Sequence, residues 1–380
     1  MELTHRQRVL RCVRWQPIDR VPIYSPVPFD PFAWERGELH GWQAEDDNYR
    51  AVAKLAAEHC SVNGRFRCAG GLFNRAYHLV PDHCIEHVSR ETVGDRTTVT
   101  TVVHTPRGDL RTVTHQDRNV TTGWYTEPLI KDKPDVDRLL SIPFEPNLPD
   151  LEPFEQERRR WGERAIVELG ISTPLVCTSR LMIFDRFLEW CALERAIIER
   201  LIEVVFERIC IRLEHLLKAG VIDGIWLGGS EQATPPMMSR EFYDDLVVPY
   251  DGRIMQLVHE HGALVHVHCH GNVNGVFERM MDMGADMLDP VEPPPDGDIE
   301  IGEAKRRARG RMVLMGNIEF RHLEFATREG IEELVRRAIC EQGKAGIMLY
   351  PSASPITWMS DQVRDNCIQY IESGLQYGRM

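Results

Sequence analysis

The stretch Ala263–Glu292, with the sequence ALVHVHCHGNVNGVFERMMDMGADMLDPVE, decides the fold class of this chain. An apolar run at 263–267 predicts a buried strand, helical spacing of apolar residues follows at 273–283, and a second apolar run lies at 286–288. A strand, a helix and a strand in this order predict a βαβ unit and therefore a parallel sheet.

The same alternation extends along the chain from about residue 165. Further buried strands are expected at 165–169, 224–227, 312–315 and 346–349, with helices at 193–218, 239–261, 327–342 and 360–377. Residues 21–24 and a weakly marked strand near 60–70 bring the number to eight, which predicts an α/β fold of the (β/α)8 TIM-barrel type. A doubly wound open sheet is the alternative, but no GxGxxG motif follows any predicted strand.

Two segments lie outside this alternation. Thr4 and Gln7 form a capping-box pattern, which predicts an N-terminal helical extension that ends near Pro17. Residues 85–125 are rich in β-branched side chains around a turn at 106–109, which predicts a β-hairpin excursion. We therefore expect a single (β/α)8 barrel domain over residues 1–380, with the hairpin at 85–125 within it.

The composition excludes several classes of protein. Acidic residues outnumber basic ones 58 to 45, giving a net charge of -13, which argues against a general binder of nucleic acid or anionic membranes. The sequence contains no apolar run of transmembrane length and no apolar signal-peptide segment, so a cytoplasmic location is expected. The ten cysteines form no CxxC pair, which excludes a zinc ribbon or a thioredoxin-like site.

The sharpest candidate site is the histidine-rich strand end at 266–270. Side chains alternate along a strand, so His266, His268 and His270 are expected on one face and Cys269 on the other. The imidazoles of His268 and His270 suit either a pair of metal ligands or a general acid and base. Structural histidines bonded at a strand end are the alternative, but three histidines within five residues favour a functional site.

Other predicted strand ends supply further candidates, because the chemistry of a β/α barrel gathers at the C-terminal ends of its strands. Glu231 follows one strand and is expected to be a catalytic base or a ligand, with a solvated loop acid as the alternative. Glu292 follows another strand and is a candidate metal ligand. The candidates for binding substrate or cofactor are Tyr24, Asp289, Asn317, Tyr350 and Ser352.

Several motifs occur in an order that resembles the uroporphyrinogen decarboxylase-like superfamily, closest in type to its cobalamin-dependent methyltransferase branch. The matching segments are Asp19-Arg20-Val21-Pro22, Thr105-Pro106-Arg107-Gly108-Asp109-Leu110, His268-Cys269-His270-Gly271-Asn272 and Gly316-Asn317-Ile318. The resemblance covers nearly the whole chain and implies a (β/α)8 barrel. It also implies methyl transfer as the activity class.

The departures from the family pattern concern the metal site. The methyltransferases hold zinc through the His and Cys of an HxC motif and a later Cys, whereas this chain has His270 at the first Cys position and no Cys at 350–354. The resemblance therefore implies a metal site with nitrogen and oxygen ligands in place of thiolates. Its ligands would be His268, His270 and either Glu292 or Glu231, and the expected ion is a divalent metal, most readily zinc. The MRQAGR signature of the decarboxylase itself is absent.

Three functions follow as hypotheses. The first is a methyltransferase that moves a methyl group between a small O- or N-methylated substrate and a corrinoid (cobalamin) carried by a partner protein, with metal assistance. The second is a cofactor-free decarboxylase or lyase acting on a small carboxylic acid, with Arg20 or Arg180 receiving the carboxylate. The third is a non-catalytic accessory or binding subunit. A homodimer is expected, because twofold dimers are the commonest closed assembly.

Overall fold

The computed structural model describes residues 2–27, 30–66, 80–118 and 123–380. Its main sheet is parallel throughout, with the strand order β1-β6-β7-β8-β9-β10-β11. The strands are β1 (Val62–Phe66), β6 (Ala165–Ser172), β7 (Gly224–Gly228), β8 (Leu264–His268), β9 (Met287–Val291), β10 (Val313–Ile318) and β11 (Ile347–Pro351).

Residues 21–24 close this sheet into a barrel. Ile23 forms a parallel bridge with Leu349 of β11, and Tyr24 forms a parallel bridge with Ser61, which directly precedes β1. The Tyr24 amide donates to the Leu349 carbonyl at 2.8 Å, and the Ser61 amide donates to the Ile23 carbonyl at 2.6 Å. The predicted (β/α)8 barrel is therefore confirmed, with the segment at 21–24 as its eighth strand.

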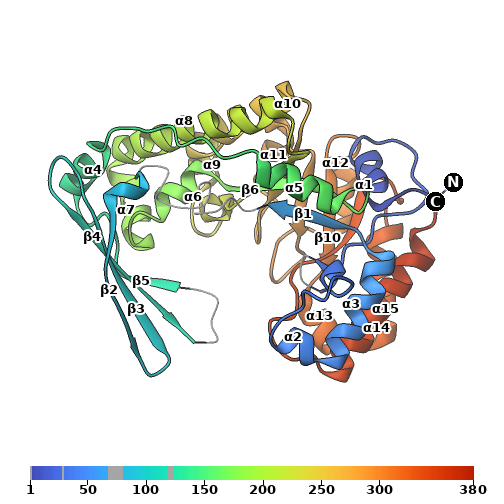
Figure 1. Ribbon diagram of the computed structural model, residues 1–380. Coiled ribbons are helices and arrows are strands. Elements are labelled where there is room, and N and C mark those ends of the chain that lie inside the picture. The colour runs from blue at the N-terminus through green and yellow to red at the C-terminus, as the bar shows by residue number, and fades with distance from the viewer. Residues whose placement is uncertain (1, 28–29, 67–79, 119–122) are drawn as a thin grey trace.

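Helices surround the barrel (Figure 1). The predicted helix at 239–261 is divided at Val247, because Pro249 lies in the first turn of the second helix and has no amide hydrogen to continue a helix from the preceding residues. The helices are α1 (His5–Val13), α2 (Trp42–Glu45), α3 (Asp47–His59), α4 (Lys133–Leu140), α5 (Glu152–Trp161), α6 (Pro174–Ser179), α7 (Phe184–Leu193), α8 (Arg195–Ala219), α9 (Arg240–Leu246), α10 (Val248–Glu260), α11 (Phe277–Met283), α12 (Ile301–Ala308), α13 (Phe320–Phe325), α14 (Arg328–Cys340) and α15 (Asp361–Gly378).

The N-terminal helix α1 closes the amino end of the barrel. Its capping box is formed as predicted: the Thr4 hydroxyl accepts from the Gln7 amide at 3.1 Å, and the Gln7 side chain accepts from the Thr4 amide at 3.3 Å. The apolar face of the helix packs against residues from the starts of several strands. This cluster contains Val9, Cys12 and Val13 of α1 together with Ile166, Met287, Val313 and Met348.

A second, antiparallel sheet projects from the barrel on the side of α4 and α7 (Figure 1). It comprises β2 (Ile85–Val93), β3 (Arg96–Val103), β4 (Leu110–Asp117) and β5 (Gly123–Glu127), in that order. The predicted hairpin corresponds to β3 and β4, which pair from Arg96 opposite Asp117 to Val103 opposite Leu110. The excursion occupies nearly the predicted residues but has four strands where a two-stranded hairpin was predicted. The strand β2 was missed because it is mostly exposed and lacks the buried alternating residues that mark a strand in a sequence.

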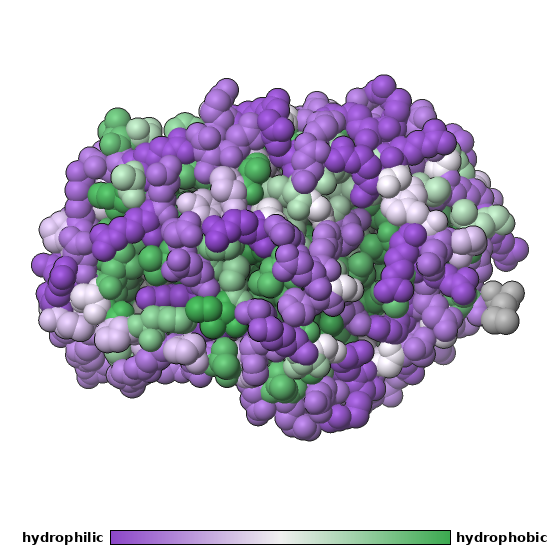
Figure 2. All heavy atoms as spheres, turned by 90° about the horizontal axis from the view of Figure 1, so that it is seen from above, coloured by the Kyte–Doolittle hydropathy of each residue, from purple (hydrophilic) through white to green (hydrophobic). Residues whose placement is uncertain are grey.

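Polar residues cover most of the face on which α8 and α10 lie, with apolar residues exposed in patches between them (Figure 2). Among the described residues, no helix is both long and apolar enough to span a bilayer.

Shortening the apolar face of α1 should destabilise the whole barrel. Val9 is 1% exposed, so Val9→Ala is expected to lower the free energy of unfolding by about 2 kcal/mol through lost burial and an unfilled cavity. Urea unfolding followed by circular dichroism measures this change. Arg14→Ala, on an exposed residue just after the same helix, should change it by less than about 0.5 kcal/mol. Equal effects of the two substitutions would show that α1 does not seal the barrel.

Candidate active site

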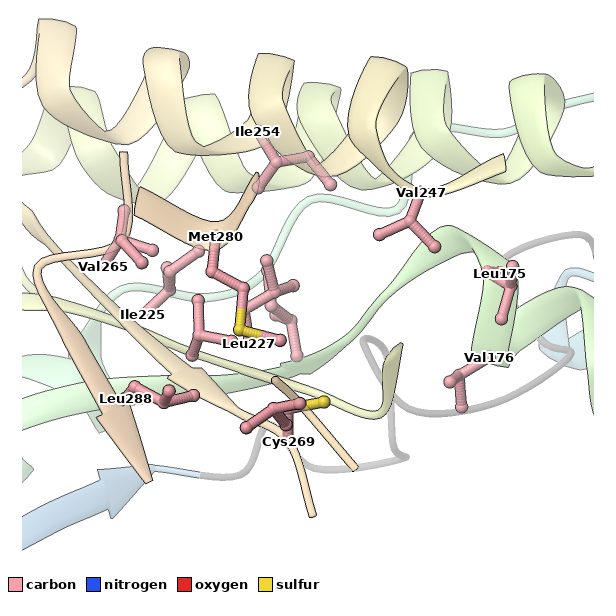
Figure 3. Close-up of a cluster of buried hydrophobic side chains, with 14 of the residues drawn as sticks. Leu175, Val176, Ile225, Leu227, Val247, Ile254, Val265, Cys269, Met280 and Leu288 are labelled. Carbon is pink, nitrogen blue, oxygen red and sulfur yellow. The ribbon is translucent and has the colours of Figure 1, made fainter. Parts of the chain in front are cut away.

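Strand alternation divides the residues of β8 between the barrel interior and the outer core. Val265 and Val267 point outward and pack against the surrounding helices, while His266 and His268 point inward. Cys269 follows the outward side, as predicted, and lies with Leu227 and Leu288 in the cluster of Figure 3. Burial raises the pKa of the Cys269 thiol well above its usual range, so this cysteine is a packing residue.

Three charged side chains lie in the barrel interior below the strand ends. Glu168 on β6, His266 on β8 and Asp289 on β9 are each 0% exposed. The His266 Nδ1 lies 3.1 Å from a Glu168 oxygen, and its Nε2 lies 2.8 Å from Asp289 Oδ1. Burial lowers the pKa of His266, but the charges of Glu168 and Asp289 outweigh burial and raise that pKa to about 9. His266 is therefore an imidazolium at neutral pH.

Asp289 connects this buried group to the barrel mouth. Its Oδ1 also accepts a hydrogen bond from His268 Nδ1 at 3.0 Å. Burial raises the pKa of Asp289, but the opposing effects of His268 and His266 outweigh burial and hold that pKa well below its usual range. The carboxylate is therefore ionised and can only accept hydrogen bonds.

His270 has a carboxylate partner of its own. Its Nδ1 lies 3.1 Å from Glu292 Oε1, and Glu292 Oε2 accepts from the Gly271 amide at 2.8 Å. Burial lowers the pKa of His270, but the hydrogen bond and the charge of Glu292 outweigh burial and raise that pKa. Glu292 therefore lies behind His270, where it orients the ring and favours its protonated form.

The His268 and His270 rings meet edge to face, with their centroids 4.6 Å apart and their planes at 87°. The Trp226 ring on β7 lies 4.5 Å from the His268 ring. Both Nδ1 atoms contact carboxylates, so the Nε2 atoms are the ring nitrogens that these carboxylates leave for a substrate. Two carboxylate-oriented imidazoles at the C-terminal end of a barrel strand can act as a general acid and a general base.

The remaining predicted residues lie on neighbouring strand ends. Tyr24 and Tyr350 touch edge to face, with their ring centroids 5.3 Å apart, and Asn317 is in register with Tyr350 on the adjacent strand. The Ser352 hydroxyl accepts from the Phe320 amide at 3.2 Å, so this hydroxyl bonds the backbone at the start of α13.

Glu231 lies in a short 3-10 helix, η5 (Ser230–Ala233), directly after β7. Within the part of the chain that the structure describes, its buried Oε2 has no hydrogen-bond partner. The neighbouring Ser230 hydroxyl donates to Asp251 of α10 at 2.9 Å, and burial raises the pKa of Asp251 to about 7. Glu231 thus belongs to the same strand-end region as the two imidazoles. Among the described residues no hydrogen bond or ion pair joins it to them, but its charge contributes to the raised pKa of His270.

The donor groups at the barrel mouth do not form a metal site among residues 2–27, 30–66, 80–118 and 123–380. No group of three or more His, Cys, Asp or Glu side chains there is arranged to hold an ion. The carboxylates of Asp289 and Glu292 contact the Nδ1 atoms of His268 and His270, so they serve as partners of the imidazoles. The described residues therefore do not fit the three-ligand zinc site expected from the sequence, and zinc stays a prediction that elemental analysis tests.

Two residues of this site were absent from the sequence-based candidates. Glu168 is a single carboxylate within a strand whose eight residues are all buried, and that contrast is the signal that could have identified it. Trp226 occupies an inward position on β7, two residues before Gly228. A Cβ atom at Gly228 would lie 2.6 Å from the Trp226 ring, so glycine provides the space that the ring needs.

Neutralising Glu292 should lower the pKa of His270. In Glu292→Gln the negative charge that favours the imidazolium is lost, while desolvation of the ring remains. Histidine C2–H exchange, followed by mass spectrometry across a pH series, measures the midpoint. His104, on the projecting sheet, is an internal control, because its pKa depends on Glu86 and Asp109 and should not change. An unchanged His270 midpoint would contradict the assigned role of Glu292.

Comparisons with known proteins agree with this architecture. A search of curated protein sequences found no significant match. Among solved structures, a methyltransferase from Methanosarcina mazei matches with a TM-score of 0.63 and 16% sequence identity, over 99% of this chain and 99% of that chain, so the fold is shared over the full length. The family model described as uroporphyrinogen decarboxylase (URO-D) matches residues 125–352, which is more than half of the sequence and includes both imidazoles. The chain belongs to the URO-D family.

Proposed function

We propose that this chain is a methyltransferase that moves a methyl group between a small O- or N-methylated substrate and a corrinoid carried by a partner protein. Membership of the URO-D family and the full-length similarity to a methyltransferase structure support this activity class. The observation that carries the proposal is the pair His268 and His270, each with a carboxylate on Nδ1 and with Nε2 left for a substrate.

The chemical requirement is activation of a poor leaving group. In the forward direction the bond between the methyl carbon and oxygen or nitrogen breaks, and its electron pair stays on the heteroatom. Cobalt(I) of the corrinoid supplies the electron pair for the new bond to carbon. An alkoxide or amide leaves readily only when a proton neutralises it.

His270 is the proton donor in this proposal. Its raised pKa favours the protonated ring, and Glu292 orients the ring so that Nε2–H is the proton available to the leaving heteroatom. His268 has the complementary role. In the neutral ring with the hydrogen on Nδ1, Nδ1–H donates to Asp289 and Nε2 offers a lone pair that accepts a hydrogen bond or a proton from the substrate.

The surroundings of the two imidazoles favour a neutral substrate. Glu231 and Glu292 follow two of the strands at this end of the barrel, and their carboxylates would repel an anionic substrate. The rings of Trp226 and Tyr350 occupy inward positions, and aromatic faces pack against the methyl groups of an uncharged methylamine, whose nitrogen takes the His270 proton as the C–N bond breaks. Within the proposed substrate class, these features favour N-methylated members.

A decarboxylase or lyase acting on a small carboxylic acid is the second candidate, and the description of the matching family model favours it. Such an enzyme needs a cation to receive the carboxylate. Arg20 does not supply one, because it precedes the strand at 21–24, at the end of the barrel opposite the imidazoles, and donates to the His59 carbonyl. Arg180, which ends α6 just after β6, remains the candidate receiver. Release of carbon dioxide from small acids without a corrinoid would identify this activity.

An anaerobic assay with cob(I)alamin tests the proposed function directly. The purified protein is mixed with cob(I)alamin and, in separate reactions, methanol, methoxylated aromatics, and mono-, di- and trimethylamine. The expected result is methylcobalamin formation, followed by absorbance, with at least one donor and fastest with an amine. Failure to form or consume methylcobalamin with any donor would overturn the proposal, and zinc analysis of the same sample shows whether a metal is present.

Replacing His270 should remove the proton donor and leave the fold intact. His270→Gln is expected to lower kcat for methylcobalamin formation about 10²- to 10⁴-fold, because that is the usual contribution of a general acid. His104→Gln is the matched control. It replaces a histidine that also pairs with carboxylates, in this case two, but that lies directly after β3 of the projecting sheet, and it should leave kcat unchanged. Equal rates for wild type and His270→Gln would exclude His270 as the acid.

A further inference from the structure

We propose that Glu168 and His266 are positioning residues that act on His268 through Asp289. They anchor the Asp289 carboxylate, which in turn holds His268 with Nδ1 protonated and Nε2 directed to the barrel mouth. The inference rests on the proposed function only in giving His268 a part in the chemistry. The arrangement of the four side chains is a property of the protein alone.

The first step is the sharing of one oxygen atom. Asp289 Oδ1 lies 2.8 Å from His266 Nε2 and 3.0 Å from His268 Nδ1. Because this oxygen contacts ring nitrogens of two histidines on β8, both contacts fix the orientation of the Asp289 carboxylate. The contact with His266, deeper in the barrel, therefore determines how the carboxylate faces His268.

The second step is that His266 is itself held. Its Nδ1 lies 3.1 and 3.3 Å from the two oxygens of Glu168, so both ring nitrogens contact carboxylates and rotation of the ring would break contacts at both ends. Glu168, His266 and Asp289 are all 0% exposed, so water does not replace these contacts.

The third step is the route of the Glu168 contact across the barrel. Glu168 on β6 and His266 on β8 are separated by β7. Glu168 is in register with Gly224 of β7, and Gly224 lies two residues before Trp226, on the same inward face. A Cβ atom at Gly224 would lie 2.5 Å from the Leu264 carbonyl oxygen, so glycine lets β7 and β8 pack closely here. With no side chain at this position of β7, the Glu168 carboxylate lies 3.1 Å from His266 Nδ1.

The fourth step is charge. A lone carboxylate in the barrel interior would take up a proton to avoid the cost of desolvation. The positive charge of His266 lies directly against Asp289 and keeps that carboxylate ionised. An ionised carboxylate only accepts hydrogen bonds, so the His268 nitrogen that faces it carries the hydrogen. A protonated Asp289 would impose no such choice.

The test measures the His268 tautomer without substrate, so that its failure is separate from failure of the proposed function. Nitrogen-15 NMR of histidine-labelled protein distinguishes protonated from bare ring nitrogens, and loss of signals in His268→Gln assigns that ring. The informative variants are His266→Phe, which keeps a ring but removes both ring nitrogens, and Glu168→Gln, which keeps the shape but removes the charge. Met287→Leu, an inward-facing change of similar volume on the strand that carries Asp289, controls for altered packing.

The wild type and Met287→Leu should show one His268 tautomer, with the hydrogen on Nδ1. In Glu168→Gln and His266→Phe this preference should be lost, and the pH profile of kcat should shift while KM changes less than about threefold. With the most active donor of the cob(I)alamin assay, kcat should fall about 10- to 100-fold, as for other residues that orient a functional group from behind.

If His266→Phe does not fold, as judged by circular dichroism, Glu168→Gln alone decides the outcome. A folded variant that retains the wild-type tautomer would overturn the inference, whatever its activity. If wild type shows the Nδ1–H tautomer but transfers no methyl group, the proposed function fails while the positioning network stands.

Discussion

The structure of the site depends on the burial of one ionised carboxylate, Asp289, inside the barrel. An isolated charge in such an environment costs several kcal/mol, so it persists only beside a compensating charge and with its lone pairs in use. His266 supplies the charge and His268 supplies a second donor. The positive ring of His266 then needs its own counter-charge, which Glu168 provides from β6. The position of each member therefore constrains the next.

These constraints order the barrel interior into layers. At the amino end, α1 packs on apolar residues such as Ile166 and Met287. Two residues further along the same strands stand Glu168 and Asp289, because side chains of one face recur at every second position. Along β8 the same period leads from His266 to His268, at the end of the strand. Closure of the amino end thus excludes water below the charged layer, and the polar side chains of His268 and His270 lie at the opposite end, at the mouth.

The sequence predicted the fold well because the signals are local. Short apolar runs separated by helical stretches give the parallel barrel, and even the short strand at 21–24 was recognisable. The histidines and acids at the strand ends could be predicted for the same reason, since the end of a strand is visible in the sequence. Glu168 could not, because its partner His266 is 98 residues away and an isolated strand does not show which face is inward. The contact of Glu292 was also hidden. Sequence spacing alone does not show whether Glu292 binds a ligand together with His270 or instead contacts the Nδ1 atom of His270.

The main difference between His268 and His270 is the carboxylate that each ring contacts. Asp289 contacts two histidines, whereas Glu292 contacts one. Asp289 divides its charge between His268 and the imidazolium of His266, so His268 faces a carboxylate already balanced by a positive neighbour. Glu292 contacts His270 and the Gly271 amide, and its charge favours the protonated ring. Identical side chains two residues apart are thereby placed in unequal fields, and this inequality allows one ring to donate a proton while the other accepts one. In the proposed reaction His266, deep in the barrel, creates that difference, and it acts through Asp289 without contact with the substrate.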